Sequence, residues 1–146
     1  MDITNTTPFK IVIAEDNTAL ADVYQIRLEM LGYTCFVGRD GEEALAIIER
    51  EKPDLVLLDM MMPKVAGDEV LRRMRSSEWG KDTRVFIISN LNEEDAPTGL
   101  RKYNIEGYAV KANLKNDDLD KLVDRILTPD GQVDSIDLDS GIPEQV

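Results

Sequence analysis

Asp54-Leu55-Val56-Leu57-Leu58-Asp59 is the stretch that decides the fold of this 146-residue chain, and Met60-Met61-Met62-Pro63 follows it directly. A short apolar run bounded by Pro53 and Pro63 is typical of a strand buried on both faces. A carboxylate at the carboxyl end of such a strand lies where open α/β sheets bind their ligands. Asp59 is therefore the first candidate functional residue.

Three other strand-like runs also end in polar side chains. They lead into Glu15-Asp16, into Ser89 and into Lys111. The carboxyl ends of parallel strands meet at one edge of a sheet, where ligands bind. We therefore expect that edge to hold three carboxylates, one hydroxyl and one ammonium group.

Strand-like and helix-like segments alternate along the chain, which predicts an α/β domain with a doubly wound, five-stranded parallel sheet and five helices. We expect strands at Lys10–Glu15, Tyr33–Val37, Asp54–Asp59, Arg84–Ser89 and Gly107–Val110. We expect helices at Thr18–Leu31, after an Asp40 cap, at Gly67–Arg75, near Asp95–Tyr103 and after an Asn116 cap. Glu43 completes a capping box with Asp40, and the helix that follows is expected to bury Ala44, Leu45 and Ile48.

Charge is distributed unevenly along the chain. The net charge is −12, from 29 acidic and 17 basic residues, and five acidic but no basic residues lie in Pro129–Val146. We expect a folded domain over residues 1–128 and a flexible acidic tail over residues 129–146. The negative charge argues against nucleic acid or an anionic membrane as a partner, so we expect neither.

The sequence excludes several kinds of chemistry. The chain contains no histidine, which rules out histidine-based triads, histidine-ligated zinc and a role as phosphohistidine donor. Cys35 is the only cysteine, so no intrachain disulfide forms and a reducing compartment is favoured. Without a signal-peptide pattern or an apolar run of membrane-span length, we expect a cytoplasmic protein.

Carboxylates gathered at one sheet edge repel one another. At about 4 Å and an effective dielectric constant of about 20, each ionised pair costs about 4 kcal/mol. Such a cluster takes up a proton or binds a cation. Oxygen ligands without histidine or cysteine favour a hard ion, so we expect Mg²⁺, with Mn²⁺ as the alternative.

Together these residues resemble the receiver domain of two-component response regulators. The resemblance covers about Phe9–Leu127, and its functional positions are spaced by 43 residues from Asp16 to Asp59, 30 to Ser89 and 22 to Lys111. The matching residues are Glu15-Asp16, Asp59, Met62-Pro63, Gly67, Ser89, Tyr108 and Lys111. The resemblance implies a flavodoxin-like fold with strand order 2-1-3-4-5.

The resemblance also implies a role for each site residue. Asp59 is expected to accept a phosphoryl group, assisted by Ser89 and Lys111, and Ser89 with Tyr108 is expected to form the switch. The implied metal ligands are Asp16 and Asp59 directly, Glu15 through water and Met61 through its backbone carbonyl. Such a domain is a signalling protein that assists its own phosphorylation and dephosphorylation.

A switch of this type implies protein partners. We expect a sensor histidine kinase or a histidine phosphotransfer protein as donor, and a downstream protein target that contacts the fourth helix, fifth strand and fifth helix. A phosphorylation-dependent homodimer is one form of output. If the chain is complete, it is a stand-alone receiver; if it continues, the tail is a linker to an output domain.

Two alternative functions remain open. The first is a receiver-like scaffold that binds partners without phosphorylation. Ala112 and Asn90 favour it, because most receivers have proline at the first position and alanine or glycine at the second. The second is a Mg²⁺-dependent phosphatase of another α/β family. It is disfavoured because the usual signature needs a second aspartate where this chain has Met61.

Overall fold

The computed structural model describes residues 8–115 and 117–129, which form one parallel sheet covered by helices. The strands follow one another in the spatial order β2-β1-β3-β4-β5, which confirms the predicted topology. Their bounds are Lys10–Ala14 for β1, Thr34–Gly38 for β2, Leu55–Leu58 for β3, Arg84–Ser89 for β4 and Gly107–Val110 for β5.

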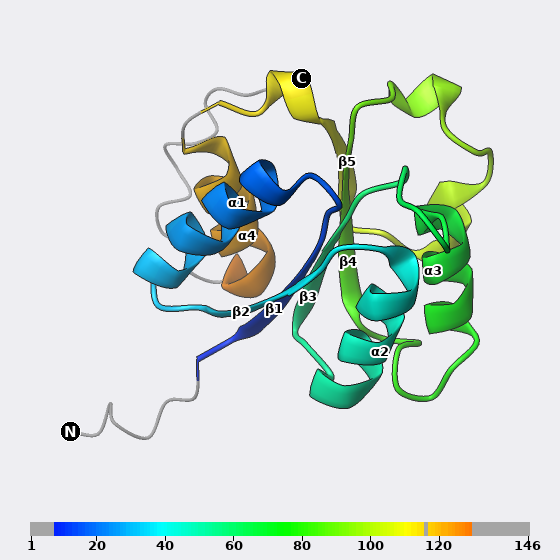
Figure 1. Cartoon of the computed structure of the whole chain (residues 1–146), viewed down its shortest axis with the longest axis horizontal. Helices are drawn as coiled ribbons and strands as arrows, with labels where there is room; N and C mark the ends of the chain where they lie inside the picture. The colour runs from blue at the N-terminus through cyan, green and yellow to red at the C-terminus, as the bar shows by residue number, and fades with distance from the viewer. Residues whose placement is uncertain (1–7, 116, 130–146) are drawn as a thin grey trace.

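The α-helices are divided between the two faces of the sheet. Helices α1 (Thr18–Met30) and α4 (Asp118–Leu127) lie on one face, and α2 (Gly41–Glu51) and α3 (Gly67–Arg75) lie on the other (Figure 1). None of the helices in the described part of the chain is long and apolar enough to span a bilayer.

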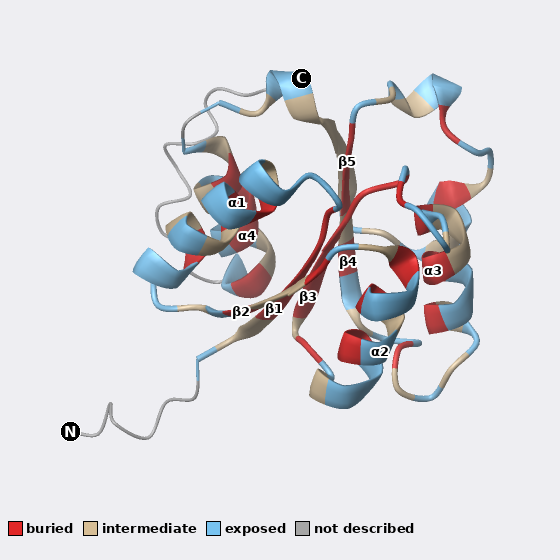
Figure 2. Ribbon diagram, in the orientation of Figure 1, coloured by how far each residue is buried: buried red, intermediate tan, exposed pale blue. Residues whose placement is uncertain are grey.

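Strand β3 lies at the centre of the sheet and is buried along its whole length (Figure 2). Its side chains alternate between two cores. Val56 and Leu58 pack with α2 and α3, whereas Leu55 and Leu57 pack with α1 and α4. The prediction of a strand buried on both faces is confirmed.

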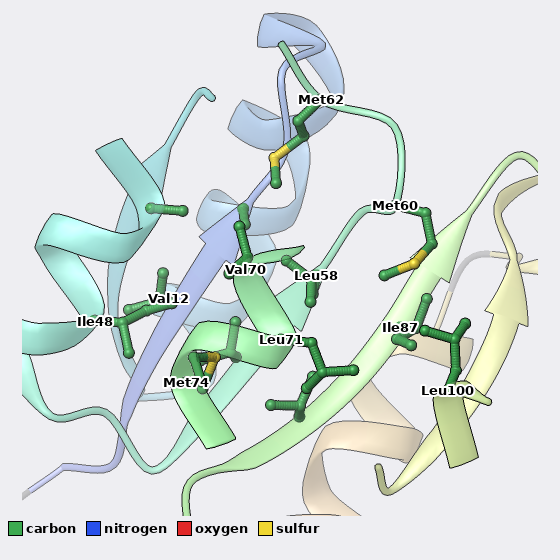
Figure 3. Packing of buried hydrophobic residues seen from close by; sticks show 14 of the residues in the cluster. Val12, Ile48, Leu58, Met60, Met62, Val70, Leu71, Met74, Ile87 and Leu100 are labelled. Atoms are coloured by element: carbon green, nitrogen blue, oxygen red, sulfur yellow. The ribbon is translucent and has the colours of Figure 1, made fainter. Parts of the chain in front are cut away.

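The methionines after β3 anchor the loop that follows it. Met60 and Met62 are 4% and 8% exposed, and their side chains point into the core beside α3 (Figure 3). Met61 lies between them and is 56% exposed. Two of the three methionines are therefore packing residues, and the third faces solvent beside the candidate site.

Helix α2 begins at the predicted cap. The Asp40 carboxylate accepts a hydrogen bond from the Glu43 N–H at 2.8 Å, and the Glu43 carboxylate reaches back to the Arg39 N–H at 2.8 Å. The helix buries Ala44 and Ile48 as expected, together with Ile47, while Leu45 is only half-buried.

The prediction of a helix near Asp95–Tyr103 is wrong. Two 3-10 turns, η2 (Glu93–Asp95) and η3 (Leu100–Tyr103), replace it, so the described residues contain four α-helices. Pro97 disfavours the helical conformation at Ala96, which is extended at φ −81° and ψ 167°. Gly99 then adopts φ +84°, a left-handed conformation that no α-helix can continue through.

The last helix begins later than expected. Helix α4 starts at Asp118, and the Asp118 carboxylate accepts a hydrogen bond from the Lys115 N–H at 2.7 Å. The expected Asn116 cap and the expected tail from residue 130 onward lie outside the described residues.

Candidate functional site

The candidate site lies at the carboxyl edge of the sheet, where several strands deliver polar residues. The register pairs Ala14 with Leu58 and Ser89 with Val110, so the residues that follow these strands meet at one edge. Glu15 and Asp59 are buried at 2% and 3% exposure, and Ser89 is fully buried. Carboxylates this buried need partners, because an unpaired buried charge is costly.

Lys111 is the partner of both buried carboxylates. Its ammonium nitrogen lies 2.7 Å from Glu15 Oε1 and 3.0 Å from Asp59 Oδ2, and its own side chain is only 11% exposed. Three residues that are 44 and 52 positions apart along the chain thus form one compact ion cluster. The structure brings Glu15, Asp59 and Lys111 together as the sequence predicted.

Backbone groups hold the two carboxylates in place. The Asn17 N–H donates to Glu15 Oε2 at 3.0 Å, and the Met61 N–H donates to Asp59 Oδ1 at 3.1 Å. Gly67 packs tightly beneath Asp59, since its N–H donates to the Met60 carbonyl at 2.9 Å and a Cβ there would clash with the Asp59 carbonyl. These contacts fix the orientation of Asp59.

Burial sets the protonation behaviour of this cluster. Burial raises the pKa of Glu15, and the nearby Asp59 charge adds to the rise, against the opposing effect of Lys111 and Asn17. Burial lowers the pKa of Lys111, but hydrogen bonds to Glu15 and Asp59 outweigh it and the pKa is raised. The stability that charged Lys111 contributes is therefore present below its usual value of 10.5 and is lost as pH rises through the folded value.

Glu15→Gln should change the pH dependence of stability. The folded pKa of Glu15 lies above its usual 4.5, so its contribution to stability is greatest below 4.5 and is lost as pH rises through the folded value. We expect the wild-type melting temperature to rise relative to Glu15→Gln as pH falls from neutral toward that value, in metal-free buffer. Differential scanning calorimetry across this range measures the difference.

A matched control for this prediction is Glu42→Gln, because the Glu42 side chain is 74% exposed on α2. The control should shift the melting temperature by the same amount at every pH. A Glu15→Gln profile that runs parallel to the wild-type profile would contradict the assigned burial effect.

The acidic cluster offers a set of ligands for a metal ion. Glu15, Asp16 and Asp59 each present a carboxylate oxygen, and these oxygens lie within 4.8 Å of one another. Two of the residues are buried and Asp16 is exposed, so the cluster opens to solvent on the Asp16 side. A cluster of oxygen donors fits a hard divalent cation such as Mg²⁺. Met61 contacts Asp59 through its N–H, and the metal-binding role of its carbonyl stays a prediction.

Ser89 and Tyr108 are linked through the backbone of Leu91. The Leu91 N–H donates to Ser89 Oγ at 3.2 Å, and the Tyr108 hydroxyl donates to the Leu91 carbonyl at 2.8 Å. Tyr108 is half-buried. A movement of Ser89 would therefore reach Tyr108 through the two hydrogen bonds of Leu91.

The two positions that depart from the family pattern lie at the rim. Ala112 is exposed within the 3-10 turn η4 (Lys111–Asn113), which the Leu114 N–H closes by donating to the Lys111 carbonyl at 3.1 Å. No peptide bond in the described residues is cis, so Lys111–Ala112 is trans. Asn90 is exposed directly after the buried Ser89.

Sequence reasoning missed two contributors to the site. Leu91 acts through its backbone groups, which leave no signal in the choice of side chain. Tyr24 of α1 is 8% exposed and lies against Glu15 and Asp59, and burial followed by the Glu15 charge raises the pKa of its hydroxyl. An aromatic residue on the buried face of a helix is indistinguishable from a core residue until the helix is placed over the site.

Residues 11–125 match the family described as the response regulator receiver domain. The chain is 35% identical over 112 residues to ycf27 of Guillardia theta, a probable transcriptional regulator, covering 76% of this chain and 42% of that protein. It is 35% identical over 101 residues to the phosphate regulon transcriptional regulatory protein PhoB of Pseudomonas aeruginosa, covering 69% of this chain and 44% of PhoB. The chain therefore spans less than half the length of these curated relatives.

A solved structure agrees with the fold. The receiver domain of sensor histidine kinase PA1611 from Pseudomonas aeruginosa, crystallised with a magnesium ion in its active-site cleft, has a TM-score of 0.72 at 22% identity. The similarity covers 83% of this chain and 98% of that one. Fold, site and sequence agree, and this chain belongs to the family of response regulator receiver domains, which are signalling domains of two-component systems.

The expectation that nucleic acid is not a partner is wrong. The curated relatives are transcriptional regulators by name, and the matched region is less than half of each. The net negative charge of this chain argues only against non-specific binding of the nucleic-acid phosphate backbone to its own surface. It carries no information about DNA contacts made by other parts of a regulator.

Proposed function

We propose that this chain is a phosphorylation-dependent switch in which Asp59 accepts a phosphoryl group from a partner histidine kinase or histidine phosphotransfer protein. The observation that carries this proposal is the environment of Asp59. Its carboxylate is buried at the carboxyl edge of the sheet, fixed by the Met61 N–H, and contacts both an ammonium group and the acidic cluster. Membership of the receiver family supports the same role.

In the proposed transfer, a carboxylate oxygen of Asp59 attacks the phosphorus atom of the donor. A new oxygen–phosphorus bond forms while the bond from phosphorus to the donor nitrogen breaks, and the electron pair of that bond stays on the donor imidazole. The product is an acyl phosphate on Asp59. The carboxylate and the incoming phosphoryl group are both negatively charged, so this transfer depends on nearby positive groups rather than on acid–base catalysis.

Lys111 supplies part of this positive charge. Its ammonium group already contacts Asp59 and is positioned to contact a phosphoryl oxygen on the same carboxylate. Glu15, Asp16 and Asp59 would hold Mg²⁺, which when bound offsets negative charge on the phosphoryl oxygens, and Mn²⁺ fits the same donor set. The Ser89 hydroxyl is the proposed hydrogen-bond donor to the phosphoryl group.

Phosphoryl uptake from acetyl phosphate should require a divalent ion. We expect intact-protein mass spectrometry to show a gain of about 80 Da, one phosphoryl group, when the wild-type chain is incubated with acetyl phosphate and Mg²⁺. Chelation of the ion should abolish the gain, because the acidic cluster then repels the donor. A chain that never gains this mass would instead be a scaffold that works without phosphorylation.

Output is proposed to involve the face formed by the β4–β5 connection, β5 and α4. The connection has no α-helix. The Arg101 guanidinium donates two hydrogen bonds to the Glu93 carboxylate, at 2.7 and 2.8 Å, and this bidentate ion pair joins η3 to η2. A segment with so little regular structure is readily biased by a small local change. Ser89 is the proposed origin of that change, and Leu91 and Tyr108 are the proposed route.

Amide hydrogen exchange should map this response. We expect beryllofluoride with Mg²⁺ to alter exchange in Leu91–Tyr103, at Tyr108 and on the exposed side of α4. Leu91 and Tyr108 are linked to Ser89 by hydrogen bonds, and α4 completes the proposed output face. Helix α2 covers β1 and β2 on the face of the sheet opposite α4 and serves as the internal control, with unchanged exchange expected over Asp40–Lys52. Changes confined to residues 89, 59 and 111 would show phosphoryl binding without transmission.

We propose a receiver unit over residues 1–128, followed by the acidic tail. Cys35 is a buried free thiol, which fits the cytoplasm as the place of action. The proposed downstream partner is a protein target or a second copy of the chain. The names of the curated relatives support a role in gene regulation, with nucleic acid among the partners.

A further inference from the structure

Helix α1 exposes an unusual amount of apolar surface. Of the five large hydrophobic residues that are exposed in the described part of the chain, four lie on α1 or at its carboxyl end. Val23, Ile26 and Met30 are 50%, 58% and 80% exposed, and their spacing of three and four residues places them along one side of the helix. Leu31, the residue that follows the helix, is 53% exposed. Apolar patches of this kind mark interaction surfaces.

The stripe formed by Val23, Ile26 and Met30 leads into a groove between α1 and the segment that precedes α4. The groove has a volume of about 260 Å³. Val23, Leu114 and Leu119 contribute apolar walls, and the charged residues that line it, Arg27, Lys111 and Lys115, are all cationic. Arg27 is neutralised by Asp120 at 2.7 Å and Lys111 by the acidic cluster. The exposed Lys115 ammonium has no ion pair among the described residues.

The chain itself contains a segment with the complementary pattern. Val133-Asp134-Ser135-Ile136-Asp137-Leu138-Asp139 alternates apolar and acidic residues, and Pro129–Val146 holds five acidic residues and no basic one. We propose that this segment docks intramolecularly along α1, with Ile136 and Leu138 against the apolar stripe and groove and with its carboxylates toward Lys115.

Chain length and direction allow this contact. Helices α1 and α4 both follow parallel strands and cover the same face of the sheet, so both run in the same direction (Figure 1). A chain leaving α4 must turn back along about 14 Å of helix to reach the level of Leu119. The seven residues from Pro129 to Ile136 span up to about 23 Å when extended, so the segment reaches the groove.

The tail can dock although each contact is weak. A tethered segment binds at an effective concentration of the order of millimolar, so modest affinity is enough for occupancy. Apolar burial of Ile136 and Leu138 supplies attraction, and the Lys115 ammonium favours an acidic segment over a basic one. The contact involves neither Asp59 nor a phosphoryl group, so it stands or falls independently of the proposed function.

Substitution in the 146-residue chain tests the proposal. We expect ¹H–¹⁵N correlation spectra of Leu138→Asp to differ from wild type at amides of α1 between Leu20 and Arg27 and at amides from Leu114 to Leu119, because the segment is released. Ile142→Asp is the matched control outside the alternating stretch and should leave these amides unchanged. Differences confined to the tail, or equal effects of the two variants, would overturn the proposal.

Charge reversal in the groove gives a second measurement. Among the described residues, both core clusters draw on positions between 9 and 127, so a chain ending at Pro129 retains every described core residue. A peptide of residues 130–146 should bind this shortened chain with submillimolar affinity, and Lys115→Glu should weaken binding about two- to five-fold, the range of an exposed ion pair. Lys102→Glu, on η3, should not change it. Absence of peptide binding would overturn the proposal.

Concentration dependence distinguishes the tail from a second copy of the chain. An intramolecular contact leaves the groove amides at the same shifts on dilution, and the mass from light scattering stays that of a monomer. Groove shifts that disappear on dilution together with a doubled mass would overturn the intramolecular assignment and make α1 an interface between copies.

Discussion

Asp59→Ala should abolish phosphoryl uptake altogether. We expect no gain of about 80 Da, one phosphoryl group, when the variant is incubated with acetyl phosphate and Mg²⁺, whereas the wild type gains it. The physical reason is that Asp59 is the proposed nucleophile, and its carboxylate is held at the end of β3 by Lys111 and the Met61 N–H. Intact-protein mass spectrometry followed by peptide mapping locates the modified residue.

Controls for this experiment come from the same chain. Asp68→Ala removes a carboxylate from the first turn of α3 and should leave uptake at the wild-type level. The stability of Asp59→Ala must be measured alongside, although removing one buried carboxylate relieves repulsion with Glu15 and leaves Lys111 paired. An adduct that persists in Asp59→Ala would assign the acceptor role to another residue.

Lys111→Met should be the most destabilising single change at the site. It leaves Glu15 and Asp59 as two buried carboxylates without a counter-charge, and breaking a buried ion pair in this way costs about 3–5 kcal/mol. The loss should be smaller at low pH, because Glu15, whose pKa is already raised by burial, can then take up a proton. Urea unfolding at several pH values measures both effects.

Lys64→Met is the matched control, because the Lys64 ammonium forms an exposed pair with Asp40 at 3.6 Å and its side chain is 61% exposed. Such surface pairs contribute about 0–1 kcal/mol. Mg²⁺ should stabilise Lys111→Met more than wild type, since an ion in the acidic cluster replaces the missing positive charge. Equal losses in the two lysine variants would show that Lys111 is not the counter-charge of the cluster.

The variants Asp59→Ala and Lys111→Met separate phosphoryl transfer from the stability of the fold at one site. Asp59→Ala removes the proposed nucleophile and retains Lys111, whereas Lys111→Met retains the nucleophile and removes a positive group that steadies it. We expect Lys111→Met to slow phosphoryl uptake even under conditions where it is folded, because transfer depends on charge stabilisation. Together they test whether the ion cluster serves the transfer or only the stability of the fold.

The sequence alone determined the sheet and the composition of its edge. Alternating apolar and helical patterns specify five strands, and the polar residues at their ends, Glu15, Asp59, Ser89 and Lys111, follow from position in a parallel sheet. The strands could be predicted because the apolar pattern of a strand, and the polar residue that ends it, lie within one short stretch of sequence. The strand order 2-1-3-4-5, implied by the family resemblance, is confirmed by the observed pairing.

The tertiary structure decided what no segment could specify by itself. The pairing of Lys111 with both Glu15 and Asp59, and the placement of Tyr24 against them, arise where elements distant in sequence meet. The Ser89–Leu91–Tyr108 link uses backbone groups that carry no signal in residue type. The segment after Asp95 shows how local signals and contacts combine. Pro97 and Gly99 are local signals against an α-helix there, and the segment forms two 3-10 turns instead. The Glu93–Arg101 ion pair joins these two turns. Local preference sets which elements can form, and contacts between them set the geometry of the site.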